Sequence, residues 1–210
     1  DVSFTGANKK EAINMSSVKE YNLNNNYRVV TTNSKTNNIN GILKIYLDNP
    51  HLEKPSASFV LNKILSEGSM LRNQEKFETD MAKDGVSLST GATEQTITSA
   101  IICDSDNFSK ALDGVREVLD NPRFTQEEFE HAKAQIKENI ETSEKSAFVK
   151  LDCELYKNLP DGVSKEEILN DLKTLTIDDV KRLYNSILQN GKANIVVSAP
   201  FDKKPELNNT

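Results

Sequence analysis

Residues Pro55 to Gly68 read PSASFVLNKILSEG, and the rest of the 210-residue chain is arranged around them. Apolar residues at Phe59, Val60, Ile64 and Leu65 recur at helical steps, the pattern of a helix that presses one face into a core. The glycine that closes the segment is a helix stop. The pattern therefore predicts a core helix at the centre of the fold.

Segments with strand character precede this helix. Residues 18–23 and 27–32 are separated by three asparagines, which tolerate the left-handed backbone conformations that hairpin turns require. Strand 42–47 alternates, with Leu43, Ile45 and Leu47 on one face and Lys44 and Tyr46 on the other. One buried and one wetter face predict an α+β fold in which an antiparallel sheet is covered on one face by helices.

Further elements are expected after the central helix. They are a helix at 74–83, a hairpin of strands 86–90 and 96–103, a helix at 107–119 with Phe108, Leu112, Val115 and Leu119 inward, and a long helix opened by a Thr125–Glu128 capping box. A helix at 147–158, one opened by Ser164 with Glu167, one that starts at Thr176 and a closing strand at 193–198 complete the prediction.

Several separated pieces of the chain follow one another in an informative order. They are LNNNYRVV, LSEGS, AKDGVSLSTGATEQTITSAI, NFSKALDGVREVLDNPRFTQEEFEHAKAQI and LKTLTIDDVKRLYNSI, which fall between Val18 and Ala199. In this order they resemble the strands and helices of the insulinase/pitrilysin family of zinc metallopeptidases, which includes the mitochondrial processing peptidase. The resemblance implies the half-domain fold of these inverzincin-type enzymes.

The catalytic signature of that family is replaced here. An active member carries HxxEH on the central helix, where two histidines bind zinc and the glutamate activates the bound water. Laid on this motif, the three positions hold Phe59, Asn62 and Lys63. Phenylalanine offers no lone pair, asparagine is a poor base and an ammonium group repels a divalent cation. We therefore expect neither a catalytic residue nor a metal site in this chain.

The resemblance also implies partners. In the family, two such halves close around an extended peptide, and often only one half carries zinc. We expect an HxxEH-bearing half, in the same chain or in a partner subunit, to hold the zinc, with no cofactor in this chain. Some active relatives place a substrate-gripping arginine and tyrosine near positions that correspond to Ala100 and Phe108, and this chain has neither. The resemblance therefore implies that this chain forms part of the wall of the peptide chamber, and no substrate-binding residue is assigned.

Composition narrows the class further. A chain that is 36% hydrophobic and 28% charged can bury one core, and its apolar runs are too short to span a bilayer. The formal net charge of −6 disfavours nucleic-acid binding, which needs a basic surface. We expect an arm or linker at 1–16, one domain at 17–200 and a tail or connection at 201–210. The first residue, Asp1, suggests a processed product or an excised piece, and the compartment stays open.

Other chemistry has weaker signals. Glu127, Glu130, His131 and Glu138 fall on one predicted helix, where a metal grip is the alternative to an ordinary solvated face. The solvated face is the simpler interpretation. Cys103 and Cys153 are either two buried thiols or a disulfide. Neither a GxSxG serine motif nor a phosphate-binding GxxxxGK[ST] loop is present.

Two functional hypotheses follow from the resemblance. The first is a non-catalytic half-domain of a zinc metallopeptidase, which forms part of the peptide-enclosing chamber. The second is a non-proteolytic structural or assembly subunit of the same fold, like the core subunits of respiratory complexes. A peptidase half should stimulate cleavage by its HxxEH-bearing partner and present a concave inner surface with an edge strand that can pair with an extended peptide. A scaffold subunit should instead remain bound in a larger assembly without any hydrolysis.

Overall fold

The computed structural model describes residues 18–24, 26–48, 54–143 and 164–201. These form one sheet of strands β1 Val18–Asn24, β2 Tyr27–Asn33, β3 Asn38–Tyr46, β4 Val86–Ala92, β5 Thr96–Asp104 and β6 Lys192–Ala199. The helices are α1 Ser56–Ser66, α2 Gln74–Lys83, α3 Phe108–Asp120 after the short turn η2 Ser105–Asn107, α4 Gln126–Ser143, α6 Lys165–Thr174 and α7 Ile177–Asn190. The predicted arm at 1–16 and helix at 147–158 lie outside the described residues.

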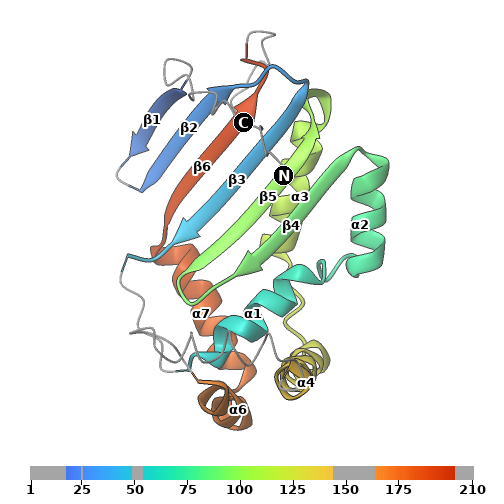
Figure 1. The fold of residues 1–210 in the computed structure, drawn as a ribbon, viewed down its shortest axis with the longest axis vertical. Coiled ribbons are helices and arrows are strands. Elements are labelled where there is room, and N and C mark those ends of the chain that lie inside the picture. Colours follow the sequence, from blue (N-terminus) through green and yellow to red (C-terminus); the bar gives the residue numbers. More distant parts are fainter. Residues whose placement is uncertain (1–17, 25, 49–53, 144–163, 202–210) are drawn as a thin grey trace, which may run out of the picture.

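The strands lie in the order β1-β2-β6-β3-β5-β4 (Figure 1). Strand β6, the last in sequence, is inserted between β2 and β3 and runs parallel to β2 and antiparallel to β3. The other pairs are antiparallel, including the predicted β1–β2 and β4–β5 hairpins. The α+β class is confirmed, and the β2–β6 pair makes the sheet mixed rather than wholly antiparallel.

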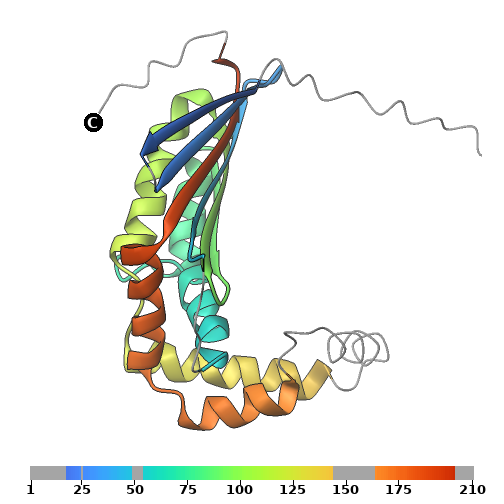
Figure 2. The same ribbon diagram turned by 90° about the vertical axis from the view of Figure 1, so that its left-hand side faces the viewer.

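Helices α2, α3 and α7 lie on one side of the sheet (Figure 2). Helices α1, α2 and α3 pack against β4, and α7 packs against β3. Helices α4 and α6 run across the lower end of the molecule and extend past the sheet on the side away from α3, so the molecule is L-shaped in this view. We call the strand face opposite α3 the open face.

Strand alternation assigns each side chain to a face. On β3, Leu43 and Ile45 point toward the helices, as the sequence predicts, whereas Ile42 and Lys44 point to the open face. The strand begins at Asn38, four residues before the predicted start, which adds Ile39 to the inward side. On β5, Ile97, Ser99, Ile101 and Cys103 are buried beneath the helices. The core therefore lies between the helices and the β3–β5–β4 part of the sheet.

Two apolar side chains expected in the core are exposed. Leu112, predicted on the inner stripe of α3, is 46% exposed, because Ala111 and Val118 turn inward beside Val115, which is buried as predicted. Phe59 on α1 is 41% exposed, while its neighbours Val60 and Leu61 are fully buried. By contrast, the inward residues predicted for α7, Val180, Leu183, Tyr184 and Ile187, are all buried.

Helix α1 is fixed at its N-terminus by residues far away in sequence. Asp171 of α6 accepts hydrogen bonds from the backbone N–H and the hydroxyl of Ser56, at 2.9 and 2.6 Å. This carboxylate satisfies a helix-end donor that no local side chain caps. Just before the helix, Lys54 donates to the carbonyl of Thr174 at 2.7 Å and lies 3.2 Å from Asp179.

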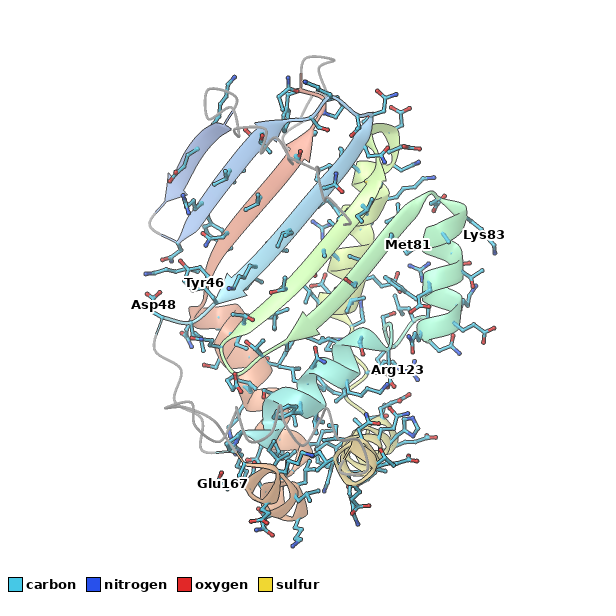
Figure 3. The ribbon with its side chains drawn as sticks, in the orientation of Figure 1. Tyr46, Asp48, Met81, Lys83, Arg123 and Glu167 are labelled. Atoms are coloured by element: carbon cyan, nitrogen blue, oxygen red, sulfur yellow. The ribbon has the colours of Figure 1, made fainter. Side chains whose placement is uncertain are left out.

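A polar network fixes the other end of α1. Gly68 leaves the helix with φ +89, and the Ser69 hydroxyl donates to Glu117 of α3 at 2.6 Å. Arg72 also binds Glu117, and it reaches Asp80 at 3.3 Å. Arg123, between α1 and α4 in Figure 3, donates to the Ser69 carbonyl at 3.0 Å. Helix α1 is therefore held at both ends.

The predicted capping residues have different outcomes. Ser164 with Glu167 forms both bonds of a capping box, and Thr176 does so with Asp179. At α4, Thr125 accepts the N–H of Glu128 at 3.2 Å, but the Glu128 carboxylate pairs with Arg123. Only half of that box forms, because the guanidinium group competes for the carboxylate.

Candidate functional site

Helix α1 lies where the sheet meets the lower helices. It packs against β4, α4, α6 and α7, at the lower end of β4 (Figures 1 and 2). Its buried side consists of Ser56, Ala57, Ser58, Val60, Leu61, Ile64 and Leu65. The residues at the three HxxEH positions, Phe59, Asn62 and Lys63, fall outside this buried set. The structure thus brings the three predicted positions together on the outer side of one helix.

Asn62, at the position of the catalytic glutamate, makes a specific contact with the sheet. Its Oδ1 accepts the backbone N–H of Ala92, at 2.9 Å, at the end of edge strand β4. The neighbouring Gly91 makes this approach possible, since a Cβ atom there would lie 2.6 Å from the same oxygen. The amide oxygen therefore covers one donor of the sheet edge.

Lys63, at the second histidine position, is engaged on its own helix. Its Nζ lies 2.9 Å from Glu67 Oε1, an i,i+4 ion pair at the C-terminal end of α1. The lysine side chain is 32% exposed and the glutamate 12%. A positively charged group therefore occupies the place where a zinc ligand would be needed.

This set of side chains does not fit a zinc ion. Phe59 has no donor atom, the ammonium of Lys63 has no lone pair, and the oxygen of Asn62 already accepts a hydrogen bond. Within residues 18–24, 26–48, 54–143 and 164–201, no three His, Cys, Asp or Glu side chains are grouped closely enough to hold a metal ion.

The acidic residues around His131 form an ordinary helix surface on α4. His131 Nε2 lies 2.8 Å from Gln135 Nε2, and Glu130 accepts from Gln126 at 2.9 Å. Glu127, Glu130, His131 and Glu138 are all exposed. The metal grip between Glu127 and His131 finds no third ligand among the described residues.

Ala100 and Phe108 are not brought together. Ala100 pairs with Ile42 and points to the open face, whereas Phe108 starts α3 and packs against the core. Cys103 is a buried free thiol, and burial raises its pKa. Its predicted counterpart, Cys153, lies outside the described residues.

The open face carries an apolar row that was not predicted from the sequence. Val30 of β2 pairs with Val196 of β6, Val196 pairs with Ile42 of β3, and Ile102 of β5 lies diagonally beside Ile42. We call these four residues the apolar stripe. Ile42, Val196 and Ile102 are 48%, 41% and 52% exposed. A signal was available, since Ile42 shares its strand face with Lys44 and Tyr46.

None of the described helices is both long and apolar enough to cross a membrane.

These features define a peptidase-like α+β domain whose central helix lacks the zinc-binding side chains. The family model of insulinase, peptidase family M16, matches residues 50–164. The chain therefore belongs to the insulinase family. No curated protein sequence is significantly similar to it.

Solved structures of low sequence identity share the fold. A conserved protein from Enterococcus faecalis is 15% identical with a TM-score of 0.70, and covers 88% of this chain and 49% of its own. A peptidase M16 inactive domain from Pseudomonas fluorescens has 16% identity, a TM-score of 0.70 and coverages of 87% and 46%. A protease from Helicobacter pylori is 16% identical with a TM-score of 0.69, and the match covers 92% of this chain and 51% of the protease. The chain thus spans about half the length of these proteins.

Proposed function

We propose that this chain is a non-catalytic half-domain of an insulinase-type zinc metallopeptidase. Its open face forms part of the wall of a peptide-enclosing chamber, and an HxxEH-bearing half, in the same polypeptide or in a partner subunit, supplies the zinc. The observation that carries the proposal is the replacement of all three motif positions on a helix that is otherwise held in place at both ends.

The chemistry of α1 supports a non-catalytic role. Peptide hydrolysis by this family requires a metal-bound water and a base, and the Phe59, Asn62 and Lys63 side chains supply neither. In place of a base, Asn62 fixes the end of β4 through Ala92. The site has thus become part of the scaffold of the domain.

The shape of the domain supports a wall. The open face is free of described helices, and α4 and α6 project below it (Figure 2). Among the similar structures is the ferredoxin protease FusC in complex with Arabidopsis ferredoxin, with 14% identity, a TM-score of 0.66 and coverage of 90% of this chain and 22% of its own. That complex provides an example of this fold in a protease that holds a polypeptide.

A direct experiment tests the wall. A photoreactive p-benzoylphenylalanine is introduced at Ile42 on the open face or at Leu112 on α3, two sites of similar exposure on opposite sides of the domain. With an extended fluorescent peptide, we expect crosslinking at position 42 and not at 112. Equal crosslinking at both would contradict the wall and favour the alternative of a purely structural subunit.

Two further measurements test the non-catalytic role and the partner. The purified chain, supplied with Zn²⁺, is expected to leave a quenched fluorescent peptide uncleaved, and stoichiometric zinc with turnover would overturn the proposal. The intact mass of the native protein, with peptide mapping around Asp1 and Thr210, distinguishes an HxxEH half in the same polypeptide from one in a separate subunit.

A further inference from the structure

The charged side chains of the chain are unevenly distributed between its two sides. The described helices carry runs of charge, such as Glu75, Lys76, Glu78 and Asp80 on α2. Among the described strands, the charged residues on the open face are Glu20, Arg28, Lys44, Asp104 and Lys192. Although the chain is 28% charged, most of the strand positions described on this face are therefore neutral.

Most of the charges on the open face are at its margins and are paired. Arg28 binds Glu20 through two hydrogen bonds of 2.8 and 2.9 Å at the β1–β2 side. Lys192 pairs with Asp48 at the lower end, beside Tyr46 in Figure 3. Asp104 is at the last position of β5. Lys44 lies within the face and forms no ion pair with another described residue.

The centre of the face is apolar and small. The apolar stripe crosses four adjacent strands, and its neighbours across the pairs are Thr32, Asn40, Ala100 and Ser198. Covering such a surface with aliphatic side chains is favourable, because it removes apolar area from water. A lysine or arginine laid on it would lose hydration, meet no unpaired carboxylate at the centre and be repelled by Lys44.

We propose that the open face receives extended peptide segments that are uncharged and rich in aliphatic and small polar residues, in preference to basic segments. This inference rests on the proposed function and specifies the substrate class of the same wall. The apolar stripe supplies the contact with aliphatic side chains, and the neutral surroundings together with Lys44 disfavour cationic ones.

Fluorescence anisotropy with the full 210-residue chain tests the preference. Two fluorescein-labelled peptides of equal length share Thr and Ser at alternate positions and carry either Val and Ile or Lys at the others, so that one face of the extended peptide is either aliphatic or basic. At physiological salt we expect the neutral peptide to bind about tenfold more tightly. Equal or tighter binding of the basic peptide would overturn the inference while leaving the wall intact.

Variants locate the binding. Ile42→Lys is expected to weaken the neutral peptide about tenfold, and Val196→Thr, nearly isosteric, to weaken it about threefold, because each reduces the apolar stripe. Leu112→Lys, the matched control on α3, should have no effect. Circular dichroism verifies that each variant is folded. Unchanged binding by both stripe variants would overturn the inference, and binding of neither peptide to the wild type would overturn the proposed wall with it.

Discussion

Asn62 on α1 accepts the backbone N–H of Ala92 on the edge strand β4, at 2.9 Å. Asn62→Leu keeps the side-chain size but removes the acceptor, so we expect the free energy of unfolding to fall by about 1 kcal/mol. Asn62→Asp keeps an acceptor oxygen and is the matched control. Urea unfolding measures both, and an equal loss in the two variants would contradict the role of this bond.

Gly91 gives a second test of the same contact. In Gly91→Ala, the new Cβ would come 2.6 Å from Asn62 Oδ1, so the amide must move and its bond to Ala92 is lost. A double-mutant cycle with Asn62→Leu should therefore be non-additive by about 0.5 kcal/mol or more, since both changes remove one interaction. Strict additivity would mean that the two residues act independently.

Asp171 provides a cap for α1 from another helix. Asp171→Ala leaves the N–H and hydroxyl of the fully buried Ser56 without their acceptor. We therefore expect the free energy of unfolding to fall by about 2 kcal/mol. Ser56→Ala removes only one of the two donors and should lose less. Asn170→Ala, an exposed neighbour on α6, is the control and should change stability by less than about 0.5 kcal/mol.

Glu117 makes part of the stability depend on pH. Hydrogen bonds from Arg72 and then Ser69 hold its pKa below the ordinary value of 4.5. A lowered folded-state pKa contributes stability that is present above 4.5 and is lost as the pH falls through the folded-state value. Urea midpoints between pH 6 and 3 should therefore fall less steeply for Glu117→Gln than for the wild type. Identical slopes would exclude this carboxylate as an acid-sensitive group.

Tyr184 joins α7 to the end of α3. Its buried hydroxyl donates to the Leu119 carbonyl, and its ring meets Phe124 edge-on at 5.2 Å. Tyr184→Phe keeps the ring contact and should lower the free energy of unfolding by about 1 kcal/mol, whereas Tyr184→Leu should lower it more. Burial raises the Tyr184 pKa to about 12, so its stabilising contribution is present below 10 and is lost as the pH rises toward 12. Absorbance titration should show one tyrosine that ionises late, and this signal should vanish in Tyr184→Phe.

Gly68 and Gly85 form a matched pair. Both have positive φ, at +89 and +67, but an added Cβ at Gly68 would lie 2.6 Å from the Arg72 carbonyl oxygen. At Gly85 the nearest atom is a side-chain nitrogen of Asn107, at 3.5 Å. We expect Gly85→Ala to lower the free energy of unfolding by about 1 kcal/mol. Gly68→Ala should lower it clearly more, because the backbone atoms near its new Cβ cannot shift without distorting the chain. Equal thermal shifts would show that the close approach has no effect.

Local patterns predicted the elements well because their signals are short-range. The helix at 74–83 was predicted with its observed bounds, and the inward residues of α7 follow from spacing and the Thr176 cap alone. The predictions that Leu112 and Phe59 face the core were wrong because periodicity is also a short-range signal. It identifies an apolar side chain but does not say which element covers it. Leu112 lies on α3 outside the sheet contact, and Phe59 falls where α1 is uncovered.

Long-range contacts could not be predicted from spacing. The bond from Ser56 to Asp171 joins residues 115 positions apart, and the contact of Asn62 with Ala92 depends on a glycine in another element. The substitutions at the motif positions were visible in the sequence, but their contacts were not. The apolar stripe required the order of the strands, because its members come from four separate segments.

The position of β6 has a consequence for how this domain is made. Strand β6 lies between β2 and β3 and pairs with both. The two parts of the sheet therefore cannot join until residues 192–199 have left the ribosome. At about 5–20 residues per second, the β1–β2 hairpin and the β3–β5–β4 unit then wait several seconds, each with an unpaired edge. Such edges invite pairing with other nascent chains. The inner edges of β2 and β3 therefore stay open to pairing with other chains until β6 closes the sheet.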